Sequence, residues 1–303
     1  MDVMDEVDGA IVELLEADGR LTHREIARAI GLSRSTAATR VQRLISSGQV
    51  VIRGAVHPAV LGRGALAHVS VSVHGPAAPV ADALARRDDV PFLSLTSGPH
   101  ALVAEIRSAS AGDVDAVVSE LRSLPGVSGV DTLMYVEVMR DVISPVGTVR
   151  TEVDDTDRAL LAALQDDGRA SYVDLAAKVG LSAAGVRRRV VRLLDARVVR
   201  VGAVVRHSGQ DRQSALGFGI RLAGGHEDAV AALAAMPSVI FVARTLGRFD
   251  LLATMRAFSA AQLVGMLDVV RALPDVRGLE SWTHLDVVKE SYAAGFDVAR
   301  VDY

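Results

Sequence analysis

The sequence predicts an α+β protein in which two small helical domains alternate with two βαββαβ domains. An internal repeat carries the first part of this prediction: IGLSRSTAATRVQRL at 30–44 returns as VGLSAAGVRRRVVRL at 179–193, 149 positions later. A period this long indicates whole domains rather than the short units of a solenoid. In each copy, apolar residues first follow a helical period and then alternate as in strands. Each copy therefore holds one helical domain and one mixed domain.

The composition narrows the classes to which the protein can belong. Its 303 residues include no cysteine, which excludes disulfides and thiolate metal sites. No apolar run approaches the ~18 residues that span a membrane, and the acidic start MDVMDEVDGA lacks the pattern of a signal peptide. We expect a cytoplasmic protein without a membrane partner. The net charge of −4 is uneven, because residues 150–212 hold 12 basic against 9 acidic side chains.

Three short helices are expected at the start of each copy. Ile11 and Leu15 share one face of the first helix, and the Asp-Gly-Arg run at 18–20 ends it. Thr22 and Glu25 have the spacing of a capping box for the second helix. The second copy repeats this pattern with Ser and the shorter Asp at the two box positions.

The turn before the third helix holds the most similar part of the repeat. Gly31 suits the left-handed end of the second helix, and Ser33 can cap the third helix through its hydroxyl. We expect third helices over 33–47 and 182–196. A Gly-containing turn before the last helix describes a helix-turn-helix, so each helical domain is predicted to be a winged-helix-like three-helix domain that binds DNA.

The rest of each copy has the element order of a ferredoxin-like βαββαβ domain. The stretch 65–73 alternates valines with polar residues, as a half-buried strand does. Two short strands flank Gly98, and a helix with an apolar face lies on either side of that pair. The predicted boundaries are 1–62 and 153–211 for the helical domains, 63–142 and 212–303 for the βαββαβ domains, and 143–152 for a linker that contains Pro and Gly.

The third helices keep an outer face rich in arginine once the core positions are removed. Guanidinium groups pair with phosphates or with both acceptors of a guanine, and Ser and Thr hydroxyls are ordinary donors to phosphate. The candidate DNA-binding residues are Arg34, Ser35, Thr36, Thr39, Arg40 and Arg43 in the first copy and Arg187, Arg188, Arg189 and Arg192 in the second. The alternative is a solvated face that pairs with the acid-rich first helix. Both interpretations stay open for Arg40 and Arg189, which lie beside core valines.

The repeated motifs resemble those of the Lrp/AsnC transcriptional regulators. The series is Asp-x-x-Asp, Asp-Gly-Arg, Gly-Leu-Ser and Arg-Val-x-Arg-Leu, followed by a βαββαβ domain. It stands at Asp5, Asp8, 18–20, 31–33 and 40–44, and again at Asp154, Asp157, 167–169, 180–182 and 189–193. The resemblance implies double-stranded DNA as a partner. It also identifies the mixed domain with the RAM domain of that family, named for the regulation of amino acid metabolism.

A usual chain of this family is one such copy that acts as a homodimer through its RAM sheet, so this chain resembles a fused dimer. The resemblance implies that the two RAM domains pair within the chain, sheet against sheet. It also implies an amino acid or related small metabolite as effector at their interfaces, and no other cofactor. Because the outer faces of the two third helices differ, the two halves of the DNA site are expected to differ. Family members stack dimers, so we expect a homo-oligomer of intramolecular pseudo-dimers associated with the nucleoid.

The resemblance places the effector site on the loop between the second and third RAM strands, which typically reads Thr-Gly-x-x-Asp. The candidate residues are Thr245, Leu246, Gly247, Arg248 and Asp250 in the second copy (TLGRFD) and Ser97, Gly98 and His100 in the first copy (TSGPHA). Gly247 would let a ligand carboxylate approach backbone N–H groups, and Asp250 could pair with an α-ammonium group. In the first loop His100 and Ala101 replace the aromatic residue and the aspartate, so ligand binding there is expected to be lost or altered.

Two plain turns are the alternative for these loops, and Asp250 could equally cap a turn or pair with Arg248. Trp282, the only tryptophan, is expected to pack within a sheet rather than to stack on a ligand.

The sequence does not favour an enzyme. The eight histidines show no close ligand pair, and no GxGxxG or P-loop motif occurs, so no catalytic or metal-binding residues are predicted. Tetrapyrrole decarboxylases share the two-domain architecture, but they carry a Tyr-Asn-Leu-Trp-like run where this chain has HALVAEI and FDLLATM. A DNA-organising protein that ignores ligands is the other alternative, because a net negative first helical domain suits modest affinity and strong salt dependence.

Overall fold

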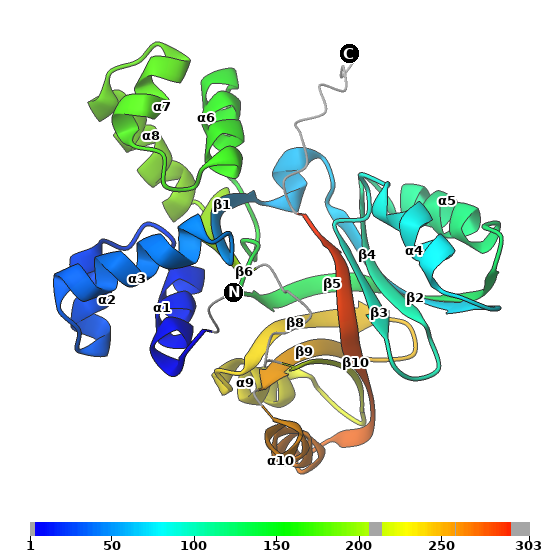
Figure 1. Ribbon diagram of the computed structural model, residues 1–303. Coiled ribbons are helices and arrows are strands. Elements are labelled where there is room, and N and C mark those ends of the chain that lie inside the picture. Colours follow the sequence, from blue (N-terminus) through cyan, green and yellow to red (C-terminus); the bar gives the residue numbers. More distant parts are fainter. Residues whose placement is uncertain (1–3, 206–213, 258, 292–303) are drawn as a thin grey trace. The chain divides into compact units, whose positions relative to one another are not determined.

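The computed structural model describes residues 4–205, 214–257 and 259–291 (Figure 1). The chain forms two compact units, and each of them draws on both copies of the repeat. Of the described residues, 4–61 and 142–205 build the helical unit, and 62–141, 214–257 and 259–291 build the barrel unit. Among the described residues, no helix is long and apolar enough to cross a membrane.

The helical unit contains two helix-turn-helix domains. Its elements are α1 Glu6–Ala17, α2 His23–Ile30, α3 Arg34–Ser46, β1 Val50–Val56, the 3-10 helix η1 Pro58–Leu61, α6 Asp155–Asp166, α7 Tyr172–Val179, α8 Ala183–Asp195 and β6 Val199–Val205. The predicted third helices are confirmed as α3 and α8, and Ser33 and Ser182 cap them as N-cap residues. Gly31 ends α2 with a left-handed φ of 69°.

The predicted capping box of α2 is confirmed, because Thr22 and Glu25 each accept the other's backbone N–H. In the second copy Ser171 accepts the N–H of Asp174. The carboxylate of Asp174, one methylene shorter than that of Glu25, accepts the hydroxyl of Ser171. Asp174 therefore bonds to the hydroxyl of Ser171, and no complete capping box forms at this helix.

The two helical domains are joined by a two-stranded antiparallel sheet in which β1 of one copy pairs with β6 of the other. The repeated Asp-Gly-Arg run takes part in this joint. Gly19 donates its N–H to Val201 at 2.9 Å, and Arg20 donates to the carbonyl oxygens of Gly168 and Ala170 at 2.7 and 3.1 Å. In the other direction, Arg169 donates to Leu21 at 2.9 Å. The sequence indicated only that this run ends the first helix.

The barrel unit contains the two βαββαβ domains. Its elements are β2 Ala65–Val73, α4 Ala78–Ala85, β3 Phe92–Thr96, β4 Leu102–Ser108, α5 Ala111–Arg122, β5 Val127–Asp141, β7 Ser214–Leu222, α9 Glu227–Ala235, β8 Val239–Leu246, β9 Leu251–Ala257, α10 Ala260–Arg271 and β10 Val276–Glu290. The strands close into one barrel in the order β10-β3-β4-β2-β5-β8-β9-β7. The two sheets thus pair within the chain edge to edge, through β5 with β8 and β10 with β3.

Alternation along the strands separates the outside of the barrel from its interior. On β2, Val69 and Val71 are fully buried in the apolar core that packs against α4 and α5. His68 and Ser70, the residues between them, therefore face the barrel interior, where they are also buried. An equivalent core lies between the second sheet and α9 and α10, and a small apolar cluster around Leu133, Phe249 and Leu252 fills part of the interior.

Candidate DNA-binding helices and barrel cavity

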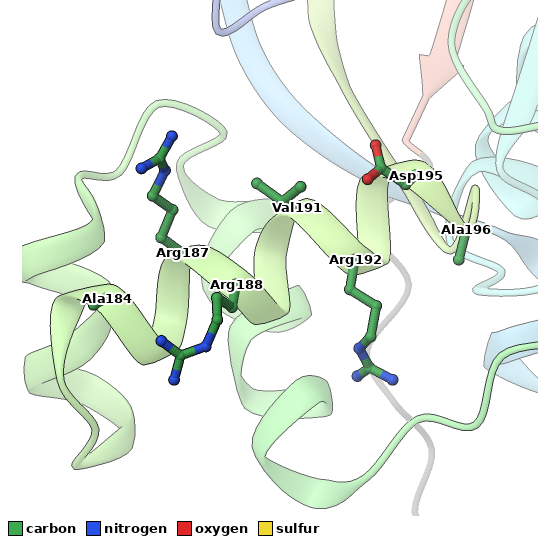
Figure 2. A pocket seen from close by; sticks show the side chains of 7 residues that line it. All are labelled: Ala184, Arg187, Arg188, Val191, Arg192, Asp195 and Ala196. Atoms are coloured by element: carbon green, nitrogen blue, oxygen red, sulfur yellow. The ribbon is translucent and has the colours of Figure 1, made fainter.

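Helices α3 and α8 bury one face and expose the other. Ala37, Val41 and Leu44 of α3 are buried, as are Val186, Val190 and Leu193 of α8. An open hollow of about 780 Å³ runs along the exposed face of α8 (Figure 2). Arg187, Arg188 and Arg192 project from the helix at this hollow, beside the apolar surface of Val191. The exposed face of α8 is therefore basic with an apolar strip.

The candidate arginines near the C-terminal end of α3 pair with carboxylates at the start of α1. Arg40 contacts Asp5 at 2.7 Å and Asp8 at 2.8 Å, and Arg43 also pairs with Asp8. Asp8 is 1% exposed, and with Asp5 it forms the capping box of α1. The bond from Arg40, helped by the backbone N–H of Asp8, lowers the pKa of the Asp5 carboxyl. Arg40 and Arg43 thus tie the third helix to the first.

The second copy repeats this arrangement. Arg189 contacts Asp154 at 2.7 Å and Asp157 at 2.9 Å, and Arg192 pairs with Asp157, which is 1% exposed. The backbone N–H of Asp157, followed by the bond from Arg189, lowers the pKa of Asp154. Asp-x-x-Asp and the two arginines of Arg-Val-x-Arg-Leu therefore form one ion-pair cluster in each copy.

The candidates near the N-terminal end of the helices are exposed. Within the described part of the chain, Arg34, Arg187 and Arg188 form no ion pair or hydrogen bond with protein groups. Ser35 and Thr36 are also exposed, and each shares a hydrogen bond with the hydroxyl of Ser33. Thr39 is exposed on the same face. These six outer residues, Arg34, Ser35, Thr36, Thr39, Arg187 and Arg188, are open to a ligand, and they differ between the copies.

The two candidate effector loops share one backbone geometry. Thr96 donates its hydroxyl to the carbonyl of His100 at 2.8 Å, and Thr245 donates its hydroxyl to Phe249 at 2.7 Å. Gly98 and Gly247 have φ values of 111° and 146°, in the region that favours glycine. Both loops therefore have the same backbone hydrogen bonding, and they differ in the side chains that surround them.

The second loop is closed by its own side chains. Phe249 is 1% exposed, and its ring lies where a Cβ at Gly219 would be, only 2.1 Å from the ring carbon Cδ2. The side chain of Asp250 accepts the N–H of Leu222 at 2.7 Å, so it caps the neighbouring strand. Leu246, the last residue of β8, is 67% exposed.

The first loop borders a cavity of about 270 Å³ inside the barrel unit. The first copy contributes Ser97 and His100 from the loop and Ser70 and Val103 from its strands. The second copy contributes Arg248, Glu280 and Trp282, among others. Of the effector-site residues predicted from the sequence, Ser97, His100 and Arg248 thus meet at one cavity. The others do not line it: Gly98, Thr245, Leu246, Gly247 and Asp250. Ser70, Val103 and Glu280 were not singled out from the sequence, and Trp282 was expected to pack within a sheet, whereas it also lines this cavity.

Two carboxylates pair with the one guanidinium at this cavity. The guanidinium of Arg248 contacts Asp131 at 2.5 Å and Glu280 at 2.6 Å, and it lies 4.3 Å from the centre of the Phe249 ring. Burial, together with the charge of Arg248, lowers the pKa of His100. The described residues contain no cluster of three or more His, Cys, Asp or Glu side chains that could hold a metal ion.

Two further histidines lie in the barrel interior: His68 is buried, and His284 is half-buried with its Nδ1 atom shielded from solvent. Burial lowers the pKa of His68 to about 3 and that of His284 to about 4, from an ordinary value of 6.5. His68 also lies 5.6 Å from Trp282, measured between ring centres. Both imidazoles are therefore neutral in the folded protein at physiological pH.

We expect the stability of the barrel unit to fall as the pH falls below 6.5. Unfolded histidines bind protons there while His68 and His284 stay neutral in the fold, so each lowers the free energy of unfolding by about 1.4 kcal/mol per pH unit. The loss ends near pH 4 for His284 and near pH 3 for His68. Urea unfolding at neutral pH and at about pH 5 measures it. His284→Gln should weaken the pH dependence and exposed His74→Gln should not; equal pH dependence in both variants would contradict the prediction.

Comparison with known proteins bears directly on these sites. Residues 4–45 and 153–194 match the AsnC-type helix-turn-helix domain, and residues 64–142 match the Lrp/AsnC ligand binding domain. Residues 226–297 match a C-terminal dimeric alpha+beta barrel domain. The HTH-type transcriptional regulator FL11 of Pyrococcus abyssi is 31% identical over 142 residues, which cover 93% of that regulator and 46% of this chain. The chain belongs to the Lrp/AsnC family of transcriptional regulators.

Other Lrp/AsnC relatives also match about half of the chain. The HTH-type transcriptional regulator LrpA of Mycobacterium tuberculosis is 31% identical over 137 residues, which cover 91% of LrpA and 44% of this chain. The duplicated architecture of this Lrp/AsnC protein is shared with the crystal structure of the siroheme decarboxylase NirDL in complex with an iron-uroporphyrin III analogue. That structure covers 96% of this chain and 95% of its own, with a TM-score of 0.64 and 14% identity, which shows a common fold alone.

Proposed function

We propose that this Lrp/AsnC protein binds double-stranded DNA through α3 and α8 and reads two unequal half-sites. One observation carries the proposal: the outer residues of these helices are exposed, the arginines among them form no ion pair with described protein groups, and the two sets differ in chemistry. Arg187 and Arg188 of α8 suit guanine or phosphate, and Thr39 with Arg34 of α3 offers one hydroxyl and one cation. Arg40, Arg43, Arg189 and Arg192 then act mainly as structural ion-pair residues.

DNA binding or assembly is proposed to respond to an amino acid or a related small metabolite in the barrel unit. The match to the Lrp/AsnC ligand binding domain and a cavity of small-ligand size support this part. Such a ligand acts only through different affinities for two arrangements of the protein. An arrangement that spaces α3 and α8 for successive major grooves would bind DNA better than one that does not.

A decarboxylase acting on a tetrapyrrole is less well supported. The cavity of about 270 Å³ lies just below the ~300–1,000 Å³ range of drug-sized ligands, and a tetrapyrrole macrocycle exceeds such a ligand. Among the described lining residues, Arg248 is the one permanent cation, and it already pairs with two carboxylates, those of Glu280 and Asp131. A substrate with several carboxylates would find little to pair with. We therefore propose a regulator rather than an enzyme.

Selection from a pool of random DNA duplexes with the full-length protein tests the proposal. The expected consensus has two different halves with centres about 10–10.5 base pairs apart or a multiple of that. Guanine should be prominent in one half, because two free arginines of α8 read it. A consensus with two identical halves would contradict the unequal reading, and no enriched sequence at all would favour a DNA-organising protein.

A further inference from the structure

The exposed faces of α8 and α3 differ most in chemistry at one pair of corresponding positions. Four exposed residues of α8 form a row at helical spacing (Figure 2): Ala184, Arg187, Arg188 and Val191. The residues 149 positions earlier, on α3, are Ser35, Ala38, Thr39 and Gln42. At the last position of the row, the polar amide of α3 is thus replaced by an apolar isopropyl group in α8.

The fold itself gives no reason for a valine at position 191. The side chain of Val191 is 40% exposed, and it lies outside the apolar core into which α8 buries Val186, Val190 and Leu193. A β-branched residue is also a poorer helix former than the glutamine of the first copy. Among the described residues that line the hollow beside α8, Val191 is the largest apolar side chain. Its surface therefore suits a ligand that carries an apolar group of its own.

The major groove of DNA offers such a group on one base. Thymine presents its 5-methyl group there, whereas the other bases present mainly hydrogen-bond donors and acceptors. Val191 cannot satisfy a donor or an acceptor, and it would shield either of them from water at a cost in free energy. Gln42 has one donor and one acceptor in its amide, which match N7 and N6 of adenine. The two helices thus suit A·T pairs through different groups of the pair.

The position of Val191 on α8 suits a base near the guanine contacts. It lies three residues beyond Arg188, which is about 4.5 Å along a helix that rises 1.5 Å per residue. Successive bases of one strand are about 3.4 Å apart. A helix lying in the major groove would therefore place Val191 one or two base pairs from the guanine of Arg188. Asp195, one turn further along the hollow, carries a charge that repels phosphates, so base contacts should end near Val191.

We propose that Val191 selects a thymine in the half-site of α8 through contact with its 5-methyl group, close to the guanine that Arg188 reads. This inference rests on the proposed function, and it names a residue that makes the two half-sites unequal. The half-site of α3, where Gln42 takes the corresponding position, does not depend on a thymine methyl group there.

Replacement of thymine by deoxyuridine in the selected duplex tests the proposal, because it removes one methyl group and keeps every hydrogen-bonding group. The half-site of α8 is the half that loses its guanine preference in the Arg187→Ala, Arg188→Ala variant. In that half we expect one thymine whose replacement weakens binding of the full chain about fourfold, as the loss of one buried methyl group does. Replacement at the corresponding place of the other half should change the affinity little. Fluorescence anisotropy measures each affinity.

Two variants and a control assign this methyl dependence to one side chain. Val191→Ala should lose most of the difference between the thymine and deoxyuridine duplexes. Val191→Gln copies the residue of α3 and should lose it as well. Val264→Ala is the matched control, because Val264 is a 56% exposed valine on helix α10 of the barrel unit. The control should keep the full fourfold difference.

The outcomes separate this inference from the proposed function. An equal difference in Val191→Ala and in the control would overturn the inference. A selected duplex whose binding ignores every thymine methyl group of that half would overturn it too. Both results leave DNA reading by α3 and α8 in place. If the selection enriches no sequence at all, the proposed sequence-specific function fails, and the inference fails with it.

Discussion

Replacing Arg187 and Arg188 together with alanine is expected to weaken binding to the selected DNA site by at least about 30-fold. A good bidentate contact to guanine is worth about 1–3 kcal/mol, and two of them would be lost. If the arginines contact phosphates, the slope of log affinity against log salt should fall by about 0.9 for each. Fluorescence anisotropy titrations at several salt concentrations measure both quantities.

Arg86→Ala with Arg122→Ala, a change at two exposed arginines of the barrel unit, is the matched control, because it removes the same two positive charges outside the helical unit. It should change DNA affinity by little. The half-site selected by the double variant should also lose its guanine preference while the other half is kept. Unchanged affinity at low salt would show that α8 is not a reading helix.

Asp157→Asn is expected to destabilise the helical unit by about 1–3 kcal/mol. The Asp157 carboxylate is 1% exposed and pairs with both Arg189 and Arg192, so the change removes the negative charge from the centre of a buried cluster. The loss stays below that of a fully buried pair, because the two arginines are 33% and 44% exposed and can regain water. Urea unfolding monitored by circular dichroism gives the change in free energy.

Asp155→Asn is the control for this change. Its carboxylate is 97% exposed and pairs with Arg158 on the same helix, so its loss should cost less than about 0.5 kcal/mol. Equal destabilisation by the two substitutions would mean that the buried cluster contributes nothing specific. DNA affinity of folded Asp157→Asn protein should remain, because Arg187 and Arg188 are not part of the cluster.

Local structure was predictable from sequence because its causes are local. The caps Thr22, Ser33 and Ser182 and the left-handed Gly31 each act within a few residues, and all stand where expected. The pairing of β1 with β6 was not predicted, since it joins strands almost 150 positions apart.

The candidate site was predictable only in part. The motif residues of the third helices were found, but their division into inner ion pairs and outer free residues depends on where α1 and α6 present Asp8 and Asp157. The cavity required knowledge of which alternate residues face inward across four strands of both copies. Ser70 and Gly219 stand at corresponding positions of the repeat, 149 residues apart. The reason for the glycine became clear only from the structure, where the Phe249 ring occupies the space of a side chain at Gly219.

Fusion of the two copies has a genetic consequence. In a homodimer each codon change appears twice, so an altered recognition helix needs two altered half-sites in the promoter at once. Here α3 and α8 are encoded separately, and the β1–β6 pairing holds both domains in one unit whatever their outer residues are. If α3 and α8 read separate half-sites, as we propose, a mutation at Arg187 or Thr39 changes one half-site alone. Each half of a promoter site can then change together with the one recognition helix that reads it.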